Sequence, residues 1–370
     1  MEPTAKGPKE LFEEVIDQGL CTLCGACAGS CPYLVSYKGR IVLLDNCTRS
    51  EGECYQYCPR TQIDLDEVSR QIFEEPYSED ELGTFKETFI ARASDESIRG
   101  RAQYGGVVTA LISLAMDRGL IDKAILTTTD DEKVPSPILA STKEEVLKSA
   151  GSSYMACSVL EAYNRLSSED DGKVGIVGVP CQCLALSKMK MDSPQNRLDI
   201  DNVTLTIGLF CTWALSPDRF HKFLGESLNL TSVTRFDIPP PPAERFDAYT
   251  SSGCVSVGLD EVRKYRMPTC AYCLDMTSEF ADISVGSVEG LEGWNTVIVR
   301  TGAGADLIER ARAEVIIETD SLPGENLAHL KEASLNKKKR ALKEIVSRTG
   351  DRDNLLYVGL SSQMADELLK

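Results

Sequence analysis

Histidine is nearly missing from this chain of 370 residues, which contains only His221 and His329. A zinc site rich in histidine needs more imidazole ligands than the chain supplies. A Ser-His or Cys-His mechanism needs a histidine beside the nucleophile, and the scarcity argues against that too. We therefore expect the chemistry of this protein to depend on other groups.

Long hydrophobic runs are missing as well. The longest apolar stretch lies near Val107–Met116, which is shorter than the roughly 18 residues that a membrane span needs. The segment from Met1 to Glu10 is polar and shows no signal-peptide pattern. We expect a cytoplasmic protein without a membrane span of its own, peripheral to a membrane complex only through a partner subunit.

Basic residues are the minority charge. The chain has 40 Lys and Arg against 57 Asp and Glu, which gives a net charge of −17 and disfavours nucleic acid as a partner. The composition, 42% hydrophobic and 26% charged, fits a soluble globular protein. The length allows two or three domains.

Cysteine, in contrast, is abundant, with 14 residues. In a cytosolic chain, clustered cysteines indicate metal or redox chemistry more often than disulfides. Residues 21–32 read Cys21-x2-Cys24-x2-Cys27-x3-Cys31-Pro32, which is the bacterial ferredoxin pattern. In that pattern the first three thiolates hold one 4Fe–4S cluster, and the fourth ligates a second cluster.

The second half of the ferredoxin pattern is irregular. It closes with Cys54-x3-Cys58-Pro59, so Cys58 is predicted to complete the cluster held by Cys21, Cys24 and Cys27. The other cluster is left with Cys31, Cys47 and Cys54, because Ser50 stands where a fourth cysteine is expected. Three alternatives remain: a 3Fe–4S cluster, a 4Fe–4S cluster with an oxygen or solvent ligand, or no second cluster. We favour a cluster with altered ligation.

Beyond these cysteines the pattern changes to alternating strands and helices, typical of an α/β domain. A helix is predicted over Val107–Arg118. Apolar runs at Lys123–Thr128, Lys173–Val179 and Val203–Phe210 predict buried strands. The expected organisation is an α+β ferredoxin-like domain over residues 1–70, an acidic connector over 71–90, an α/β core over 91–325 and a helical tail over 326–370.

Four cysteines of the core domain stand at positions that suit a ligand site. Cys181 and Cys211 follow two predicted strands, and ligands bind at the carboxyl ends of strands in open α/β sheets. Cys270 and Cys273 form a tight pair in a loop. The residues alone leave two alternatives open, a third cluster or inert buried thiols with a redox pair. The remaining Cys157, expected within a helix over Ser152–Leu166, Cys183 and Cys254 are expected to have packing roles.

Seven motifs then occur in order along the chain: Gly-Gly-Val-Val-Thr-Ala-Leu (105–111), Ala-Gly-Ser-Ser-Tyr (150–154), Val-Gly-Val-Pro-Cys-Gln (177–182), Gly-Leu-Phe-Cys (208–211), Cys-x2-Cys-x-Asp (270–275), Ala-Asp-Ile-Ser-Val-Gly-Ser-Val (281–288) and Gly-Trp-Asn-Thr-Val (293–297). This set resembles the coenzyme F420 hydrogenase/dehydrogenase β-subunit family. The resemblance extends to members with a ferredoxin-like extension, such as the F(420)H(2) dehydrogenase input subunit and formate dehydrogenase β subunits.

The resemblance implies that the core domain binds FAD and holds a 4Fe–4S cluster on Cys181, Cys211, Cys270 and Cys273. It places three glycine-containing segments near the flavin. The implied cofactor-binding residues are Gly105, Gly106, Val107, Thr109, Gly151, Ser152, Tyr154, Gly286 and Ser287.

A chemical argument leads to the same function. A deazaflavin or nicotinamide carrier exchanges a hydride, iron–sulfur clusters exchange single electrons, and a flavin does both. The predicted path runs from reduced coenzyme F420, or a similar carrier, through FAD and the clusters to a partner subunit, and it is reversible. Arg92, Arg99 and Arg101 are candidates to bind the carrier's phosphate-bearing tail.

Two alternatives compete with this function: a ferredoxin-dependent reductase of another substrate on the same scaffold, and an electron-wiring subunit without a soluble substrate. The expected partner complex is a hydrogenase, a formate dehydrogenase, a heterodisulfide-reductase-type complex or a membrane dehydrogenase. The sequence leaves the identity of the partner open.

Overall fold

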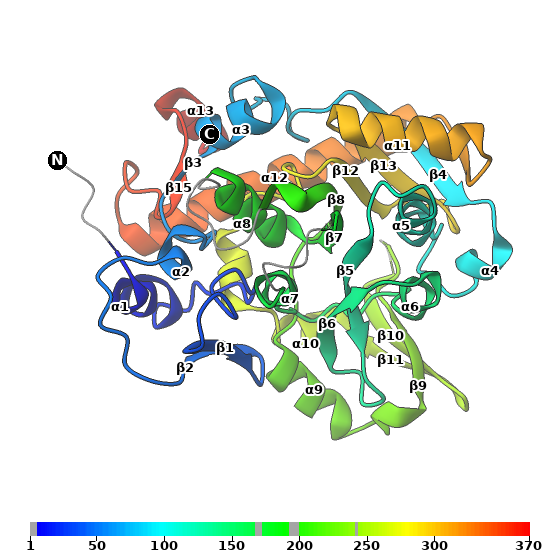
Figure 1. The fold of residues 1–370 in the computed structure, drawn as a ribbon, viewed down its shortest axis with the longest axis horizontal. Coiled ribbons are helices and arrows are strands. Elements are labelled where there is room, and N and C mark those ends of the chain that lie inside the picture. The colour runs from blue at the N-terminus through cyan, green and yellow to red at the C-terminus, as the bar shows by residue number, and fades with distance from the viewer. Residues whose placement is uncertain (1–5, 167–171, 192–199, 241–242) are drawn as a thin grey trace.

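The structure is a computed structural model that describes residues 6–166, 172–191, 200–240 and 243–370 (Figure 1). The helices are α1 (Pro8–Leu11), α2 (Glu53–Gln56), α3 (Leu65–Phe73), α4 (Glu96–Arg99), α5 (Val107–Asp117), α6 (Lys143–Lys148), α7 (Val159–Asn164), α8 (Pro180–Met191), α9 (Pro217–Gly225), α10 (Leu259–Arg263), α11 (Gly302–Ala313), α12 (Gly324–Thr349) and α13 (Ser362–Leu368). Short 3-10 or π segments are η1 (Phe12–Ile16), η3 (Ile200–Asn202), η4 (Leu230–Ser232) and η5 (Pro268–Tyr272).

The strands form sheets of different sizes. They are β1 (Leu34–Tyr37), β2 (Arg40–Leu43), β3 (Ile63–Asp64), β4 (Glu87–Ala93), β5 (Lys123–Thr129), β6 (Pro135–Ala140), β7 (Val174–Gly178), β8 (Val203–Leu209), β9 (Val233–Asp237), β10 (Arg245–Thr250), β11 (Gly253–Gly258), β12 (Ile283–Ser287), β13 (Asn295–Val299), β14 (Ile317–Asp320) and β15 (Val358–Gly359). In the described part of the chain the largest sheet has eight strands, in the order β14-β4-β13-β12-β8-β7-β5-β6.

The centre of the large sheet is parallel. β5, β7, β8 and β12 run in one direction, with Ile125 beside Ile176 and Ile283 beside Ile207. β6 joins one edge and β13 the other in antiparallel fashion. The three apolar runs predicted as strands become β5, β7 and β8. The mixed α/β core predicted from the sequence is therefore confirmed.

Helices cover both faces of this sheet. On one face, α5 and α11 bury their apolar residues against the strands, and Leu111 and Ile112 are fully buried there. On the other face, residues of α7 and α8 pack against alternate strand positions, such as Ile125 and Ile176. Each fully buried side chain of this size stabilises the fold by roughly 1.5–3 kcal/mol, so the sheet is a rigid base for the loops at its end.

The ferredoxin-like region at the N-terminus is fastened to α7. The Asn164 carboxamide donates hydrogen bonds to the carbonyl oxygens of Gly25, Ala26 and Ala28, at 3.2, 2.8 and 2.8 Å. Gly25 has a φ of +89°, and a Cβ there would lie 2.8 Å from the Ser158 carbonyl oxygen. Only glycine allows this close approach, so the cysteine loop is held against the core domain.

The C-terminal segment returns to the N-terminal one. β15 pairs in parallel with β3, with Val358 opposite Ile63. Both strands share a hydrophobic cluster with Leu342 and Ile345 of α12. The helix α12, drawn in orange, runs between the large sheet and the ferredoxin-like end (Figure 1). The residues expected as a connector over 71–90 begin within α3 and end inside β4.

One helix is shorter than the sequence predicts. The prediction of a helix over Ser152–Leu166 is wrong at its start, because α7 begins only at Val159. Tyr154 has a left-handed φ of +60°, which ends helical geometry there, and Met155 forms an isolated bridge with Leu215. Cys157 therefore lies ahead of the helix, where it is buried as expected.

The expected packing role is confirmed for Cys183 and is wrong for Cys254, whose side chain does not pack in the interior. Cys183 is buried in α8, and Cys254 lies in β11 with its side chain exposed. Among the described helices, none is long and apolar enough to cross a membrane.

Candidate functional site

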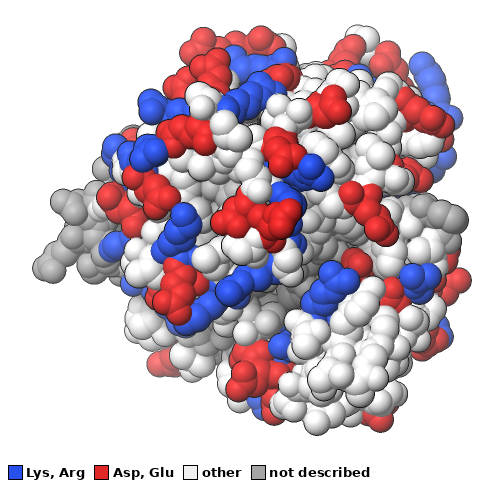
Figure 2. Space-filling model, turned by 90° about the vertical axis from the view of Figure 1, so that its right-hand side faces the viewer, with Lys and Arg blue, Asp and Glu red and all other residues white. Residues whose placement is uncertain are grey.

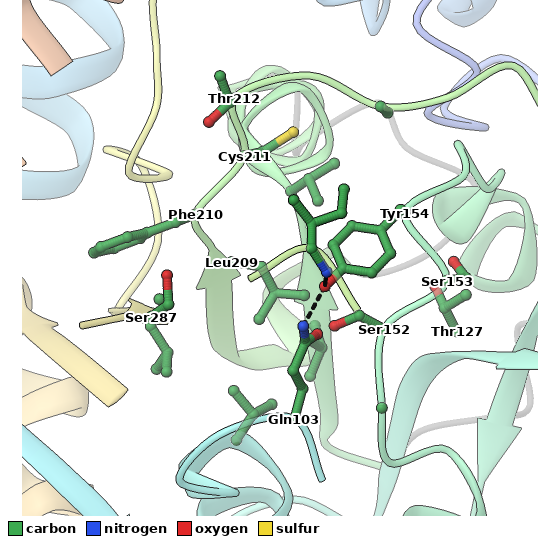
Figure 3. A pocket seen from close by; sticks show the side chains of 18 of the residues that line it. Gln103, Thr127, Ser152, Ser153, Tyr154, Leu209, Phe210, Cys211, Thr212 and Ser287 are labelled. Atoms are coloured by element: carbon green, nitrogen blue, oxygen red, sulfur yellow. Dashed lines mark hydrogen bonds between the residues drawn. The ribbon is translucent and has the colours of Figure 1, made fainter. Parts of the chain in front are cut away.

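The four parallel strands end at the same edge of the sheet, where their following residues meet. Thr127–Thr129 at the end of β5, Val179–Cys181 after β7, Phe210–Cys211 after β8 and Gly286–Glu289 at the end of β12 all line one cavity (Figure 3). Its volume is about 800 Å³, within the usual range for sites that bind small molecules and cofactors. This is the position at which open α/β sheets bind their ligands.

Most residues of the three predicted glycine-containing segments line this cavity. The segment before α5, the segment before α7 and the end of β12 converge on it from separate parts of the sequence. The residues concerned are Gly106, Val107, Thr109, Gly151, Ser152, Tyr154, Gly286 and Ser287.

Gly105 is the implied cofactor-binding residue that is not among those lining the cavity. A Cβ at this residue would lie 2.7 Å from the Asn295 Oδ1 and 2.8 Å from the Ala91 carbonyl oxygen. The glycine is thus needed where the chain passes close to β4 and β13. The same Asn295 Oδ1 accepts a hydrogen bond from the Val107 N–H at 3.4 Å, which fixes the start of α5 at the cavity.

Packing also explains why residue 286 is a glycine. A Cβ there would lie 1.9 Å from the Phe210 ring, so the absence of a side chain makes room for that ring at the cavity wall. Phe210, just after β8, and Ser287, at the end of β12, both line the cavity (Figure 3). The sequence signals the glycine but not its partner.

Tyr154 is anchored by residues that the sequence did not single out. Its hydroxyl accepts hydrogen bonds from the Gln103 carboxamide and from the Ile238 N–H, the latter at 2.9 Å (Figure 3). Gln103 also donates to Asp237 Oδ1 at 2.7 Å. Burial raises the pKa of the Tyr154 hydroxyl, so this group stays protonated. The network joins the segment before α5 to the three-stranded sheet of β9, β10 and β11.

The four core cysteines line the same cavity. Cys181 opens α8, Cys211 follows β8, and Cys270 and Cys273 lie in and just after η5. Their sulfurs act on one another electrostatically, Cys181 with Cys211 and Cys273, and Cys211 with Cys270. The Ala214 N–H donates to the Cys270 Sγ at 3.4 Å. The fold therefore brings together cysteines that are far apart in the sequence.

Positive charge compensates part of the burial of these thiols. Burial raises the pKa of Cys211 to about 12. Burial also opposes ionisation of Cys273, but the charges of Lys337 and Arg60 lower the pKa of this thiol below its ordinary value. Lys337 Nζ donates to the carbonyl oxygens of Cys211 and Asp275, both at 2.6 Å. Since the thiolate is the form that ligates iron, this positive charge favours ligation by Cys273, whereas burial raises the pKa of Cys181, Cys211 and Cys270.

The ferredoxin-like cysteines separate into the two predicted groups. Cys27 interacts electrostatically with Cys24, Cys21 and Cys58. Burial raises the pKa of Cys58 to about 12. We call these four thiols the first ferredoxin-like group; a cluster on them stays a prediction.

The second group is the irregular one. Cys54 interacts with Cys31 and Cys47, and burial raises the pKa of Cys54 to about 11. Ser50, which stands at the position of the missing cysteine, is exposed. Cys31 and Cys47 thus both interact with Cys54, and a cluster on the three thiols stays a prediction.

The three groups form a series. Cys181 of the core group interacts with Cys24 of the first ferredoxin-like group, and Cys27 of that group interacts with Cys54 of the second. The order is therefore core group, first ferredoxin-like group, second ferredoxin-like group. Among the described residues, no three His, Cys, Asp or Glu side chains converge as a single metal ion would require.

Basic side chains line the outer part of the cavity. They include Arg101, Lys133, Lys148, Arg235 and Arg263, and Figure 2 shows Lys and Arg side chains beside a hollow on one face of the molecule.

The predicted candidates Arg92 and Arg99 are engaged elsewhere. Arg92 pairs with Glu318 at 2.6 Å, and Arg99 donates to the Ala93 carbonyl oxygen at 2.6 Å. Of the three predicted arginines, only Arg101 lines the cavity. The sequence did not signal the other basic residues of the rim because they come from distant segments.

Comparison with known families gives matches in the order of the structural parts. Residues 14–35 match the family described as "4Fe-4S binding domain". Two further matches are to the family described as "Coenzyme F420 hydrogenase/dehydrogenase, beta subunit": its N-terminal part matches residues 88–164, and its C-terminal part matches residues 171–325. The two longer matches contain most of the cavity and all four core cysteines.

Individual proteins give the same result. The chain is 33% identical over 275 residues to the β subunit of coenzyme F420 hydrogenase from Methanothermobacter thermautotrophicus, with 72% of this chain and 96% of that protein covered. It is 29% identical over 319 residues to the F subunit of F(420)H(2) dehydrogenase from Methanosarcina mazei, with 84% and 88% covered. A solved chain of the F420-reducing NiFe hydrogenase complex from Methanosarcina barkeri has a TM-score of 0.68 and 31% identity, with 73% of this chain and 94% of that chain covered.

Proposed function

The chain belongs to the coenzyme F420 hydrogenase/dehydrogenase β-subunit family, and we propose that it exchanges electrons between coenzyme F420 and a series of iron–sulfur clusters. Membership and the iron–sulfur motif make it an oxidoreductase subunit. The finer proposal is that the cavity at the strand ends binds FAD, and that Cys181, Cys211, Cys270 and Cys273 hold a 4Fe–4S cluster beside it.

One observation carries this proposal: the four core cysteines and eight of the nine implied flavin-binding residues line the same cavity. A flavin that accepts a hydride must pass its electrons singly to an iron–sulfur cluster. The distance between flavin and cluster is short when both are bound at one cavity wall. The arrangement of Cys211 after β8 and Ser287 at the end of β12, on adjacent strands, supplies that common wall (Figure 3).

The cavity fits a flavin in several respects. Its size suits a cofactor, and a Cβ at Gly151 would meet nothing within 4 Å, so the wall is open at this glycine. The hydroxyls of Thr127, Ser152 and Ser153 face the cavity (Figure 3). When bound, the flavin supplies both hydride and one-electron chemistry. Two hydrogen bonds would fix the walls against which the flavin lies. Gln103 holds Tyr154, and Asn295 holds the start of α5.

The cysteine groups fit clusters by the chemistry of their donors. Thiolates are the usual ligands of iron–sulfur clusters, and each proposed group collects three or four cysteines. The series from Cys181 through Cys24 and Cys27 to Cys54 directs electrons from the cavity to the ferredoxin-like end of the molecule. A partner subunit is proposed to accept them there, in keeping with relatives that are named as subunits of F420 hydrogenase and F(420)H(2) dehydrogenase.

The basic rim fits an anionic carrier. Positive charge along the cavity comes from Arg101, Arg235, Lys133 and Lys148, in a protein of net charge −17. Arg263 also lines the cavity but pairs with Asp260 and Glu244. Such local charge attracts an anionic ligand that the molecule as a whole repels. Hydride exchange requires alignment of the two rings more than a strong acid or base, which is consistent with the scarcity of histidine.

Addition of the reduced carrier under anaerobic conditions tests the proposal. Purified protein with its cofactors restored is mixed with reduced F420, and in a parallel sample with NADH. We expect the flavin absorbance to bleach near-stoichiometrically with F420. Bleaching with neither carrier, in protein that contains flavin and iron, would favour an electron-wiring subunit without a soluble substrate.

A further inference from the structure

One buried arginine lies between the core cysteines and the first ferredoxin-like group. Arg60 is 5% exposed. Its Nε donates to the Thr269 Oγ1 at 3.0 Å, and its guanidinium lies over the Tyr357 ring, 4.3 Å from the ring centroid. Thr269 in turn donates to the Leu20 carbonyl oxygen at 2.6 Å. Every member of this set is buried, so the arginine is held in one place.

The contacts of Arg60 connect the two cysteine groups through the chain. Thr269 directly precedes Cys270 of the core group. Leu20 directly precedes Cys21 of the first ferredoxin-like group, and Arg60 itself follows Cys58 by two residues. A single guanidinium thus fastens three cysteine-bearing segments that come from opposite parts of the sequence.

The charge of Arg60 acts on both groups. It affects Cys21 and Cys24 on one side and Cys270 and Cys273 on the other, with a hydrogen bond to Cys273. Among the groups that raise its own pKa, Tyr357, Cys273 and Cys181 act most strongly. The strongest electrostatic neighbours of this arginine are therefore a phenol and two thiols.

Two lysines provide a contrast, because each serves one group: Lys337 is buried and Lys188 is partly buried. Lys337 donates to the carbonyl oxygens of Cys211 and Asp275 and acts on core cysteines. Lys188 donates to the Cys58 carbonyl oxygen at 3.0 Å and to the Thr61 Oγ1 at 2.7 Å, on the ferredoxin-like side. Among the described residues, Arg60 is the buried cation that acts on both groups.

We propose that Arg60 is a positioning residue that raises the reduction potentials of the core cluster and the first ferredoxin-like cluster together. The proposal rests on the proposed function, since it requires clusters on both cysteine groups. A nearby fixed positive charge favours the reduced, more negative form of a cluster. Because the charge is shared, both potentials shift in the same direction, and the driving force between the two sites is largely preserved.

The electron step is balanced without a proton. One electron passes between the groups, so one side is oxidised by one electron and the other is reduced by one. Arg60 keeps its charge throughout, since a guanidinium does not lose its proton in proteins. The arginine therefore lowers the cost of holding an electron on either side and takes no part in bond making or breaking.

Redox titration followed by electron paramagnetic resonance tests the proposal on the full, anaerobically reconstituted chain. In Arg60→Gln, we expect both midpoint potentials to fall, by on the order of a tenfold change in the reduction equilibrium, about 59 mV for one electron. Lys337→Gln is expected to lower only the core potential, and Lys188→Gln only the ferredoxin-like one. If Arg60→Gln retains its iron and moves one potential or neither, the proposal is wrong.

A second pair of variants keeps the test decisive if Arg60→Gln loses iron. Arg60→Lys keeps the positive charge and Arg60→Met removes it, so both potentials are expected to fall together in Arg60→Met relative to Arg60→Lys. A fall in only one potential, or in neither, overturns the proposal. A parent protein without cluster signals would instead contradict the proposed function, and the inference would fall with it.

Discussion

The ferredoxin-like cysteines and the core cysteines are assembled in different ways. Cys21, Cys24 and Cys27 lie within seven residues of one another, and a short loop suffices to bring their sulfurs together. Cys181, Cys211 and Cys270 come from distant segments, and the first two meet only because β7 and β8 are adjacent parallel strands. The first group depends on local spacing, and the second depends on the topology of the whole sheet.

This difference predicts how each group responds to change. A group built by local spacing is recognised in the sequence and depends on its loop. A group built by topology also depends on strand packing and on buried contacts far from the sulfurs. Substitutions in the two regions test whether a cysteine group depends on its own loop or on the packing of the sheet. Their expected effects differ in size.

The largest effect is expected from the core group itself. Cys181→Ala removes one proposed ligand, so we expect a loss of about four irons per chain and of electron transfer from reduced F420 to an external acceptor. Iron analysis and anaerobic spectroscopy measure both.

The matched control is Cys183→Ala, two residues further along α8. Cys183 is also buried but is expected only to pack, so its iron content should equal that of the parent. Equal iron in both variants would remove Cys181 from the ligand set.

A buried ion pair ties α12 to the core. Lys338 Nζ lies 2.8 Å from Glu279 Oε1, with side chains 5% and 1% exposed. Lys338→Met would leave Glu279 buried without this cation, and we expect the free energy of unfolding to fall by about 3–5 kcal/mol. Denaturant unfolding measures the change.

Lys331→Met on the same helix is the control. Lys331 pairs with Asp80 where both side chains are about one third exposed, and such pairs contribute at most about 1 kcal/mol. A loss for Lys338→Met no larger than for Lys331→Met would show that the buried pair does not fasten the tail.

A smaller effect is expected at the cavity wall. Gly286→Ala places a Cβ against the Phe210 ring, and overpacking of this kind costs about 1–3 kcal/mol. We also expect weaker flavin retention, measured by the flavin that remains bound after gel filtration.

Gly258→Ala provides the comparison, because a Cβ there meets nothing within 4 Å and should change stability by less than about 0.5 kcal/mol. If the two alanine variants unfold and retain flavin alike, the close approach of Phe210 has no consequence for the cavity.

The smallest expected change concerns the second ferredoxin-like group. Ser50→Cys restores the missing thiolate of the ordinary spacing. We expect the cluster signal of this site to change, with about one more iron per chain if the parent holds a 3Fe–4S cluster. Thr48→Cys, in the same exposed loop, is expected to leave the signal unchanged. An unaltered spectrum in Ser50→Cys would show that residue 50 does not lie at a ligand position of the cluster.

The same contrast explains what the sequence could predict. The ferredoxin-like groups, the parallel strands and α5 follow from spacing and from apolar runs, which are local signals. The hydrogen-bond partners around the cavity do not follow from local signals. Gln103 and Asp237 meet at Tyr154 only because the fold brings distant segments together. The β3–β15 pair is only two residues long on each side, too short to leave a pattern.

The errors have physical causes of the same kind. The predicted helix over Ser152–Leu166 fails because Tyr154 adopts a left-handed backbone, which no residue-type signal announces. Arg92 was expected near the carrier but pairs with Glu318 across β4 and β14. A charged residue's partner is set by strand pairing, and strand pairing was not determined by the sequence alone.

The central claim is that sulfur ligands hold iron clusters beside a flavin bound at the strand ends. Cofactor analysis of anaerobically reconstituted protein tests it most directly, by measuring iron and extracted flavin on the same sample. The account predicts one FAD and about eleven or twelve irons per chain. A colourless protein that retains neither iron nor flavin after reconstitution would contradict it.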